Sequence, residues 1–425
     1  MAQFTSAVYQ NEFLPAGGTD VHAIVNVTCS DAGQAGSGGG RAGEIVVVDT
    51  SGSMGIQNME LAKQAAVAAV EQIIDGTWFA VVAGNHRAYL AYPRNPGPVG
   101  MVQMNPQTRF EAVNSIRTFR AEGGTAIGSW LNLTRALFES VPDLSQRHAL
   151  LLTDGENHNE TPVQLDAAIR ASIGAFQADC RGVGTDWVVA EIRRISQALL
   201  GTVDIIPEPS MMPRVFAELI QQSMGRGVAE ATLRVWAPQG AQVLFCRQVL
   251  PQVEDLTHRG TPVNPLTVDF PTGAWGDESR DYHVAVRLAA REIGQEQLAA
   301  RVQLVVGQQP VTQGLVKARW SDDDALTTRI DPAVAHYTGQ TELAEAIQAG
   351  LAAKAAGRTD EATTRLGRAV QLAAETGNEE ATSRLRKVVD VDDAETGTVR
   401  LKKSVDKADE MALDTASTKT TRTRG

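Results

Sequence analysis

The chain has 425 residues, with 39 Lys plus Arg and 50 Asp plus Glu, which gives a formal net charge of −11. At roughly 100–200 residues per domain, this length predicts two to four domains, and 43% hydrophobic and 21% charged residues are typical of a folded protein. The acidic balance excludes a general nucleic-acid or membrane-surface binder, because both ligands attract basic proteins.

Residues 1–41 predict one strand and a linker. Polar and apolar residues alternate over residues 21–28, a period of two that is typical of a half-buried strand. Residues 32–40 are rich in Gly, Ser and Ala and lack the Lys-Ser/Thr pair of a phosphate-binding loop, so we interpret them as a flexible linker. A lone strand needs a partner, and we expect it to pair with the β-rich region further along the chain.

Residues 42–225 have the pattern of an α/β domain. Short apolar runs, suited to strands buried on both faces, alternate with longer amphipathic segments. The expected strands lie at residues 45–48, 78–83, 149–152, 176–183 and 203–206, and the expected helices at residues 57–74, 107–121, 126–141, 186–200 and 213–224. This alternation predicts an α/β fold with a doubly wound, mostly parallel sheet and helices on both faces.

Three further regions follow. Residues 226–320 contain alternating segments separated by Pro and Gly turns, which predicts a β-sandwich domain. Residues 335–390 contain amphipathic segments at residues 340–356, 360–376 and 378–388. They resemble one tetratricopeptide-like repeat, and a short helical hairpin packed on the body of the protein is an equal alternative. Residues 391–425 are polar and rich in Thr, so we expect a disordered tail.

Loops of the predicted α/β domain carry oxygen-bearing side chains where a ligand would sit. Ligands of open α/β sheets lie beyond the carboxyl ends of the strands. The side chains, each next to the end of a predicted strand or the start of a predicted helix, are Asp49, Ser51, Ser53, Thr125 and Asp154. Such hard oxygens suit Mg²⁺ or Mn²⁺ better than metals that prefer thiolate or imidazole. Helix capping explains the first loop alone.

This pattern resembles a von Willebrand factor type A (VWA) domain with an intact metal-ion-dependent adhesion site (MIDAS). The family motif is DxSxS, then a loop Thr, then a strand-end Asp, and all five positions are matched within residues 42–225. The resemblance implies that Ser51, Ser53 and Thr125 bind the metal directly and that Asp49 and Asp154 act through water. It also implies that an Asp or Glu of a partner protein completes the coordination.

The whole arrangement is similar to that of intracellular bacterial, actinobacterial-type VWA proteins, in which the VWA domain is inserted into a β-sandwich. We interpret the polar residues 154–160 as a rim that contacts the partner. We expect a metal-dependent protein-interaction module or scaffold. One alternative is the partner-binding subunit of a MoxR-type or chelatase-like ATPase. A second is a signalling scaffold whose C-terminal threonines are phosphorylated by a Ser/Thr kinase and read by a forkhead-associated domain. A third is a structural protein with a vestigial metal site.

The sequence does not predict an enzyme. The Asp-Thr-Ser-Gly at residues 49–52 matches the Asp-Thr-Gly of subtilisin-like or aspartic proteases only in part, and no partners of a Ser/His/Asp triad follow. An aspartyl-phosphate phosphatase would need a second carboxylate at position 51, which is Ser51.

The cysteines bear on the cellular compartment. Cys29, Cys180 and Cys246 lie far apart, without the spacing of a disulfide framework or a zinc site. No apolar run is long enough to cross a bilayer, and the first residues lack the basic and apolar regions of a secretory signal. We therefore expect a cytoplasmic protein.

Overall fold

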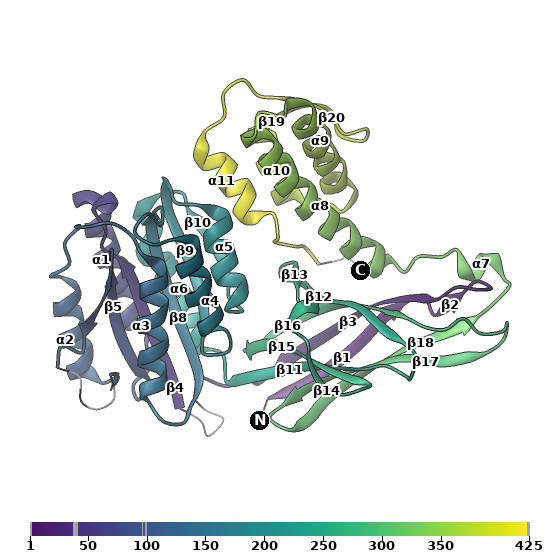
Figure 1. Cartoon of the computed structure of the whole chain (residues 1–425), viewed down its shortest axis with the longest axis horizontal. Coiled ribbons are helices and arrows are strands. Elements are labelled where there is room, and N and C mark those ends of the chain that lie inside the picture. Colours follow the sequence, from purple (N-terminus) through teal and green to yellow (C-terminus); the bar gives the residue numbers. More distant parts are fainter. Residues whose placement is uncertain (1, 37–40, 96, 98–99, 423–425) are drawn as a thin grey trace. The chain divides into compact units, whose positions relative to one another are not determined.

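The computed structural model describes residues 2–36, 41–95, 97 and 100–422, and Figure 1 labels its helices and strands. It divides into two compact units. The first contains the described residues of 32–229 together with 273–276, and the second contains those of 2–31, 230–272 and 277–425. The first unit is thus inserted, in the chain, between parts of the second. Among the described residues, no helix has the length and apolar character needed to cross a membrane.

The first unit is built on a seven-stranded sheet of order β10-β9-β8-β4-β5-β6, with β7 paired to β5. The strands are β4 (Arg41–Asp49), β5 (Trp78–Gly84), β6 (Ala88–Tyr92), β7 (Val102–Gln103), β8 (Leu144–Gly155), β9 (Gln177–Asp186) and β10 (Val203–Ile206). Neighbours from β10 to β5 are parallel, and β6 and β7 run antiparallel to β5. The predicted doubly wound, mostly parallel sheet is confirmed.

Helices cover both faces of this sheet (Figure 1). They are α1 (Gly55–Gln72), α2 (Pro106–Ile116), α3 (Ile127–Ser140), α4 (Pro162–Ser172), α5 (Val189–Ala198) and α6 (Met212–Met224). Val46 and Val48 of β4 belong to one apolar cluster with residues of α1, α2 and α6, for example Phe216. Ile45 and Val47 alternate with them and are equally buried. Burial on both faces explains the unbroken apolar run of β4.

Three ionisable side chains are buried in the amino-terminal halves of neighbouring strands. His148 of β8 lies between Glu44 of β4 and Asp179 of β9, with nitrogen–oxygen distances of 2.6 Å and 2.9 Å. Ser223 of α6 donates to the other oxygen of Glu44 at 2.8 Å. Burial alone lowers the pKa of His148, but the two carboxylates outweigh it and raise the pKa to about 9. This network therefore ties α6 to three central strands.

The second unit contains two sheets, of order β1-β3-β16-β12-β13 and β14-β15-β11-β17-β18-β2. The strands are β1 (Gln3–Gln10), β2 (Phe13–Leu14), β3 (Asp20–Ser30), β11 (Val228–Trp236), β12 (Gln242–Leu250), β13 (Glu254–Asp255), β14 (Thr261–Asn264), β15 (Thr267–Trp275), β16 (Glu278–Arg287), β17 (Glu296–Val306) and β18 (Gln309–Trp320). Burial alternates along β18, because one of its faces packs on the core. The strand expected at residues 21–28 is β3, which pairs with β16 and β1.

Helices follow the sheets of the second unit. A short helix α7 (Asp324–Thr327) precedes α8 (Pro332–Ala355), α9 (Thr359–Glu375) and α10 (Glu379–Val388), and these last three occupy the three predicted amphipathic segments. They share an apolar cluster that includes Leu343 of α8, Leu366 of α9 and Leu385 of α10. This cluster gives the helical region its own core.

The prediction of a disordered tail over residues 391–425 is wrong for the described part. The chain forms a strand pair, β19 (Val389–Asp393) with β20 (Thr398–Leu401), and then α11 (Lys407–Ala416). Val399 and Leu413 are buried in the same cluster as α8–α10, and Asp406 caps α11 by accepting from the Ala408 amide at 2.9 Å. The few apolar residues of this polar segment are enough to order it, because α8, α9 and α10 supply the rest of the apolar core. Residues 423–425 of the predicted tail and 37–40 of the predicted linker lie outside the described residues.

Candidate metal centre

The two predicted aspartates lie at the carboxyl ends of adjacent central strands. Asp49 ends β4, Asp154 lies next to the end of β8, and β4 and β8 are parallel neighbours. From β4 the sheet continues on one side to β5 and on the other to β8, so this edge is a topological switch point. Open α/β sheets bind ligands at such points. Both carboxylates are buried.

Two serine hydroxyls connect these carboxylates. The Ser51 and Ser53 hydroxyl oxygens are 2.8 Å apart, and the Ser53 hydroxyl donates to Asp154 Oδ1 at 2.7 Å. The Ser51 amide donates to Asp49 Oδ1 at 2.8 Å, which turns the backbone directly after β4. The Thr153 hydroxyl donates to the other oxygen of Asp49 at 2.7 Å. The DxSxS loop and the end of β8 are therefore one hydrogen-bonded unit.

Hydrogen bonds from both sides hold the loop that contains Thr125 against the DxSxS loop and the residues after β8. The Gly52 amide donates to the Gly123 carbonyl at 2.8 Å. Asn159 holds Thr125 from the other side. Its side-chain Oδ1 accepts from the Thr125 backbone amide at 3.0 Å, and its own backbone amide donates to the Thr125 carbonyl at 2.9 Å. Thr125 is 3% exposed, and its hydroxyl makes no hydrogen bond within the described part of the chain. This hydroxyl is therefore available to a ligand at the site.

Gly155 shows that the three hydroxyls converge on one space. A Cβ atom placed on this glycine would lie 2.8 Å from Ser53 Oγ, 3.2 Å from Thr125 Oγ1 and 3.7 Å from Ser51 Oγ. We call the space bounded by these three hydroxyls, Asp154 and Gly155 the hydroxyl cradle. Any side chain at position 155 would fill it, whereas glycine leaves it free for a small ligand. The structure thus brings all five predicted residues together.

The electrostatics of the cradle favour a cation. Burial raises the pKa of Asp49. Burial, together with the charges of Asp49 and Asp186, raises the pKa of Asp154 to about 6. Neither Asp49 nor Asp154 has a Lys or Arg ion-pair partner in the described part of the chain. A bound divalent cation would supply the missing positive charge.

The donor set fits a hard cation. Hydroxyl and carboxylate oxygens are the ligands that Mg²⁺ and Mn²⁺ prefer. Across the described residues, no group of three or more His, Cys, Asp or Glu side chains is placed to hold a metal. Among the described residues, the group of three hydroxyls and two carboxylates is therefore the metal site that we consider, and no cluster of His, Cys, Asp or Glu offers an alternative.

Sequence reasoning missed the residues that support the site. Gly155 and Thr153 are ordinary residue types at the end of a strand, so only the three-dimensional contacts reveal their part. The rim predicted at residues 154–160 is in part structural: Glu160 Oε1 accepts from the Gly128 amide at 2.6 Å and Asn157 Oδ1 from the Ile127 amide at 3.2 Å. Both therefore cap the N-terminus of α3. No local pattern predicts this, because α3 begins about 30 residues before these two side chains in the chain.

Family models match two parts of the chain. The von Willebrand factor type A domain model matches residues 45–197. The von Willebrand factor type A C-terminal domain model matches residues 371–417, which span the end of α9 to α11. VWA domains are generally non-enzymatic, metal-dependent modules of protein interaction that bind a divalent metal at the MIDAS.

Solved structures and a curated relative extend the match. The chain is 46% identical to a von Willebrand factor type A structure from Catenulispora acidiphila, with a TM-score of 0.93 over 99% of this chain and 97% of that one. The ArnB paralog VWA2 from Sulfolobus acidocaldarius shares the fold, at 16% identity and a TM-score of 0.61 over 98% of each chain. An uncharacterized protein from Synechocystis sp. is 32% identical over 220 residues, or 50% of this chain, and the chain spans about half (49%) of its length. The match to the Catenulispora structure over nearly both whole chains shows that the chain belongs to the von Willebrand factor type A family.

Proposed function

We propose that the chain is a protein-interaction module that binds an acidic side chain of a partner through Mg²⁺ or Mn²⁺ in the hydroxyl cradle. The observation that supports it is the convergence on Gly155 of three hydroxyls from two loops. In this proposal Ser51, Ser53 and Thr125 hold the metal directly, and Asp49 and Asp154 act through water.

The chemistry of the donors suits capture of a carboxylate. When bound, the metal supplies positive charge and a free coordination position. Neutral hydroxyls do not cancel that charge, and Thr153 and the Ser51 amide engage both oxygens of Asp49. An Asp or Glu of the partner therefore meets an attractive field at a site that would repel it without the metal.

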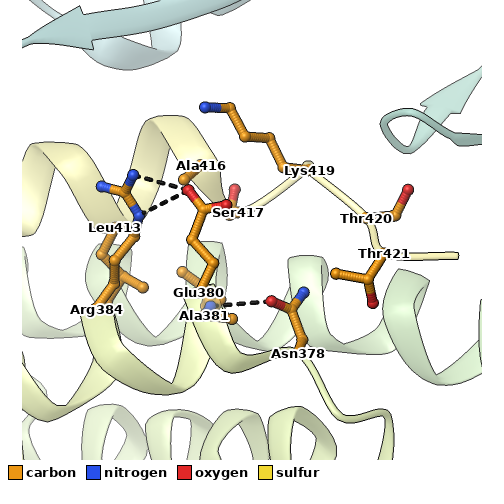
Figure 2. Close-up of a pocket in the computed structure, with 11 residues that line it drawn as sticks. Asn378, Glu380, Ala381, Arg384, Leu413, Ala416, Ser417, Lys419, Thr420 and Thr421 are labelled. Atoms are coloured by element: carbon orange, nitrogen blue, oxygen red, sulfur yellow. Dashed lines mark hydrogen bonds and ion pairs between the residues drawn. The ribbon is translucent and has the colours of Figure 1, made fainter.

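The phosphorylation-dependent scaffold has less support from the tail. Figure 2 shows a small pocket between α10, α11 and the segment that follows, in which Arg384 pairs with Glu380 at 2.8 Å. Ser417 and Thr418, the two residues that follow α11, are 5% and 8% exposed. The Thr420 hydroxyl donates to the Val249 carbonyl at 2.6 Å. A kinase would first have to detach this segment, whereas Thr396 and Thr398, beside the turn between β19 and β20, are exposed. We prefer the interaction module because the convergence of the three hydroxyls on Gly155 supports it.

The partner, the location and the source of the protein are further parts of this proposal. No feature of the described residues favours a MoxR-type ATPase as the partner over another protein, and we place the partner class only as one that offers an Asp or Glu. We propose a cytoplasmic location, because Cys29, Cys180 and Cys246 are buried free thiols, which suits a reducing compartment. A bacterial source of the actinobacterial type belongs to the same proposal.

Isothermal titration with Mg²⁺ and with Mn²⁺ tests the site. We expect saturable binding to the wild type and at least about tenfold weaker binding to Ser53→Ala and to Asp49→Ala. Ser145→Ala is the matched control, because Ser145 lies near the opposite end of β8 and its hydroxyl is exposed. Circular dichroism checks that each variant is folded. Equal binding by folded wild type and Ser53→Ala would contradict the proposed site.

A further inference from the structure

Acidic side chains lie on one side of the hydroxyl cradle. The sheet order places the carboxyl end of β9 beside that of β8. Asp186, the last residue of β9, is exposed and pairs in register with Gly155. Glu156 follows Gly155 and is exposed as well, with His158 Nε2 at 3.0 Å from its carboxylate. Glu191 lies in the first turn of α5, which begins just after β9.

The two arginines of α5 do not cancel this charge in full, because Arg193 is buried and Arg194, which acts on Glu191, is shared with Asp166. Arg194 is paired with Asp166 of α4, with a nitrogen–oxygen distance of 2.7 Å. His158 carries a full positive charge only when protonated, and it sits beside one of the three carboxylates. The β9 side of the cradle is therefore negative. We define Glu156, Asp186 and Glu191 as the acidic rim.

Exposed apolar side chains surround the same edge of the sheet. Helices that follow parallel strands begin where those strands end, so their first residues lie on the metal-site edge. Ile56, the second residue of α1, is 93% exposed and follows the DxSxS loop directly. Val163, the second residue of α4, is 73% exposed, and Val188 before α5 is 38% exposed. Interfaces combine such apolar contacts with charged rims.

An independent observation marks this edge as a ligand site. The Thr125 hydroxyl belongs to a residue that is 3% exposed, points toward the space at Gly155, and has no hydrogen-bond partner among the described residues. The acidic rim and the apolar residues thus flank the space at Gly155 on which the three hydroxyls converge.

We infer that this face binds a partner segment with one anchoring Asp or Glu, a Lys or Arg beside it that meets the acidic rim, and an apolar side chain that covers Ile56. This inference rests on the proposed function, since the anchoring carboxylate needs the metal. The rim makes the surface selective: a run of several acidic residues would satisfy the metal but be repelled by Glu156 and Asp186. Nucleic acid and phospholipid meet the same repulsion along their phosphates.

A library of random linear peptides, selected on the full chain in saturating Mg²⁺ and again in EDTA, tests the inference. Wild type is compared with the double variant Glu156→Gln/Asp186→Asn and with Ile56→Ser. Glu139→Gln, near the other end of α3, and Ile173→Ser, after α4, are matched controls far from the cradle edge. Mg²⁺ binding of every variant is titrated separately, and each selection uses Mg²⁺ that saturates that variant.

We expect wild type and both controls to enrich peptides with one Asp or Glu, a Lys or Arg and an apolar residue, and only with Mg²⁺. Peptides selected on the double variant still contain the Asp or Glu but are no longer enriched in Lys or Arg. The double variant binds the best wild-type peptide roughly fivefold more weakly. Ile56→Ser loses the apolar preference. Enrichment of Asp or Glu without Lys or Arg, or of acidic runs, overturns this inference and leaves the proposed function standing. Absence of any Mg²⁺-dependent enrichment contradicts both.

Discussion

Replacing Gly155 by Ala is the smallest change that fills the hydroxyl cradle. The added Cβ would lie 2.8 Å from Ser53 Oγ and 3.2 Å from Thr125 Oγ1, both closer than ordinary carbon–oxygen contact. Gly155 lies at the end of β8 and is not among the glycines with positive φ in the described residues, so alanine fits its backbone. The substitution therefore acts on the space for the metal and leaves the path of the chain intact.

The size of the effect follows from these distances. Both hydroxyls must retreat by a few tenths of an ångström, whereas metal–ligand distances tolerate about 0.2 Å. Displacing even one ligand lowers metal affinity by about tenfold to a hundredfold on the scale of well-packed metal sites. The crowding itself costs about 1–3 kcal/mol of stability, which a protein of this size tolerates.

Titration calorimetry and thermal unfolding measure the two effects separately. We expect Gly155→Ala to unfold cooperatively, to bind Mn²⁺ at least about tenfold more weakly than wild type, and to lose most of the stabilisation that added metal gives wild type. Gly225→Ala is the matched control, because a Cβ there meets only ordinary contacts at 3.4 Å and 3.5 Å. If Gly155→Ala binds metal as tightly as Gly225→Ala, the cradle is not the metal site.

Three further changes test other parts of the structure. Asn159→Ala removes the side-chain acceptor of the Thr125 amide, and we expect about tenfold weaker Mn²⁺ binding with the fold retained; unchanged affinity would show that the loop needs no such support. His148, buried between two carboxylates, has its pKa raised above the unfolded value of about 6.5 to about 9. Its stabilising contribution is therefore complete below about pH 6.5 and is lost as the pH rises through about 9. Urea unfolding should show a stability loss across this window that is larger in wild type than in His148→Gln, and parallel profiles would refute the assignment. Tyr337→Phe removes the hydroxyl that donates to the buried carboxylate of Asp281; we expect about 1–3 kcal/mol lower stability in urea, and a change near zero would argue against that bond.

The residues of the candidate site could be predicted because their chemistry is visible in the local sequence. An apolar run buried on both faces ends in a carboxylate at Asp49 and again at Asp154, and parallel strands bring such ends to one edge. The alternation of runs and amphipathic segments likewise determined the fold of the first unit. Both signals depend on residues close together in the chain.

The parts that sequence reasoning missed depend on contacts between distant residues. Gly155 matters because hydroxyls from two other loops converge on it. Asn159 matters because its side chain accepts a hydrogen bond from the Thr125 amide, 34 positions earlier in the chain. The tail looked disordered because its own apolar residues are few. Leu413 and Val399 become core residues once α8–α10 provide the opposing surface, which composition alone does not reveal.

The most direct test of the central claim is a crystal structure of the chain grown with Mn²⁺, with the metal located by anomalous scattering. With Mn²⁺ at a concentration near the wild-type Kd, we expect one strong peak in the hydroxyl cradle, within about 2.0–2.3 Å of the hydroxyl oxygens of Ser51, Ser53 and Thr125, and a clearly weaker peak in Gly155→Ala. An anomalous peak elsewhere with the cradle empty, or a peak in the cradle of Gly155→Ala as strong as in wild type, would contradict the central claim.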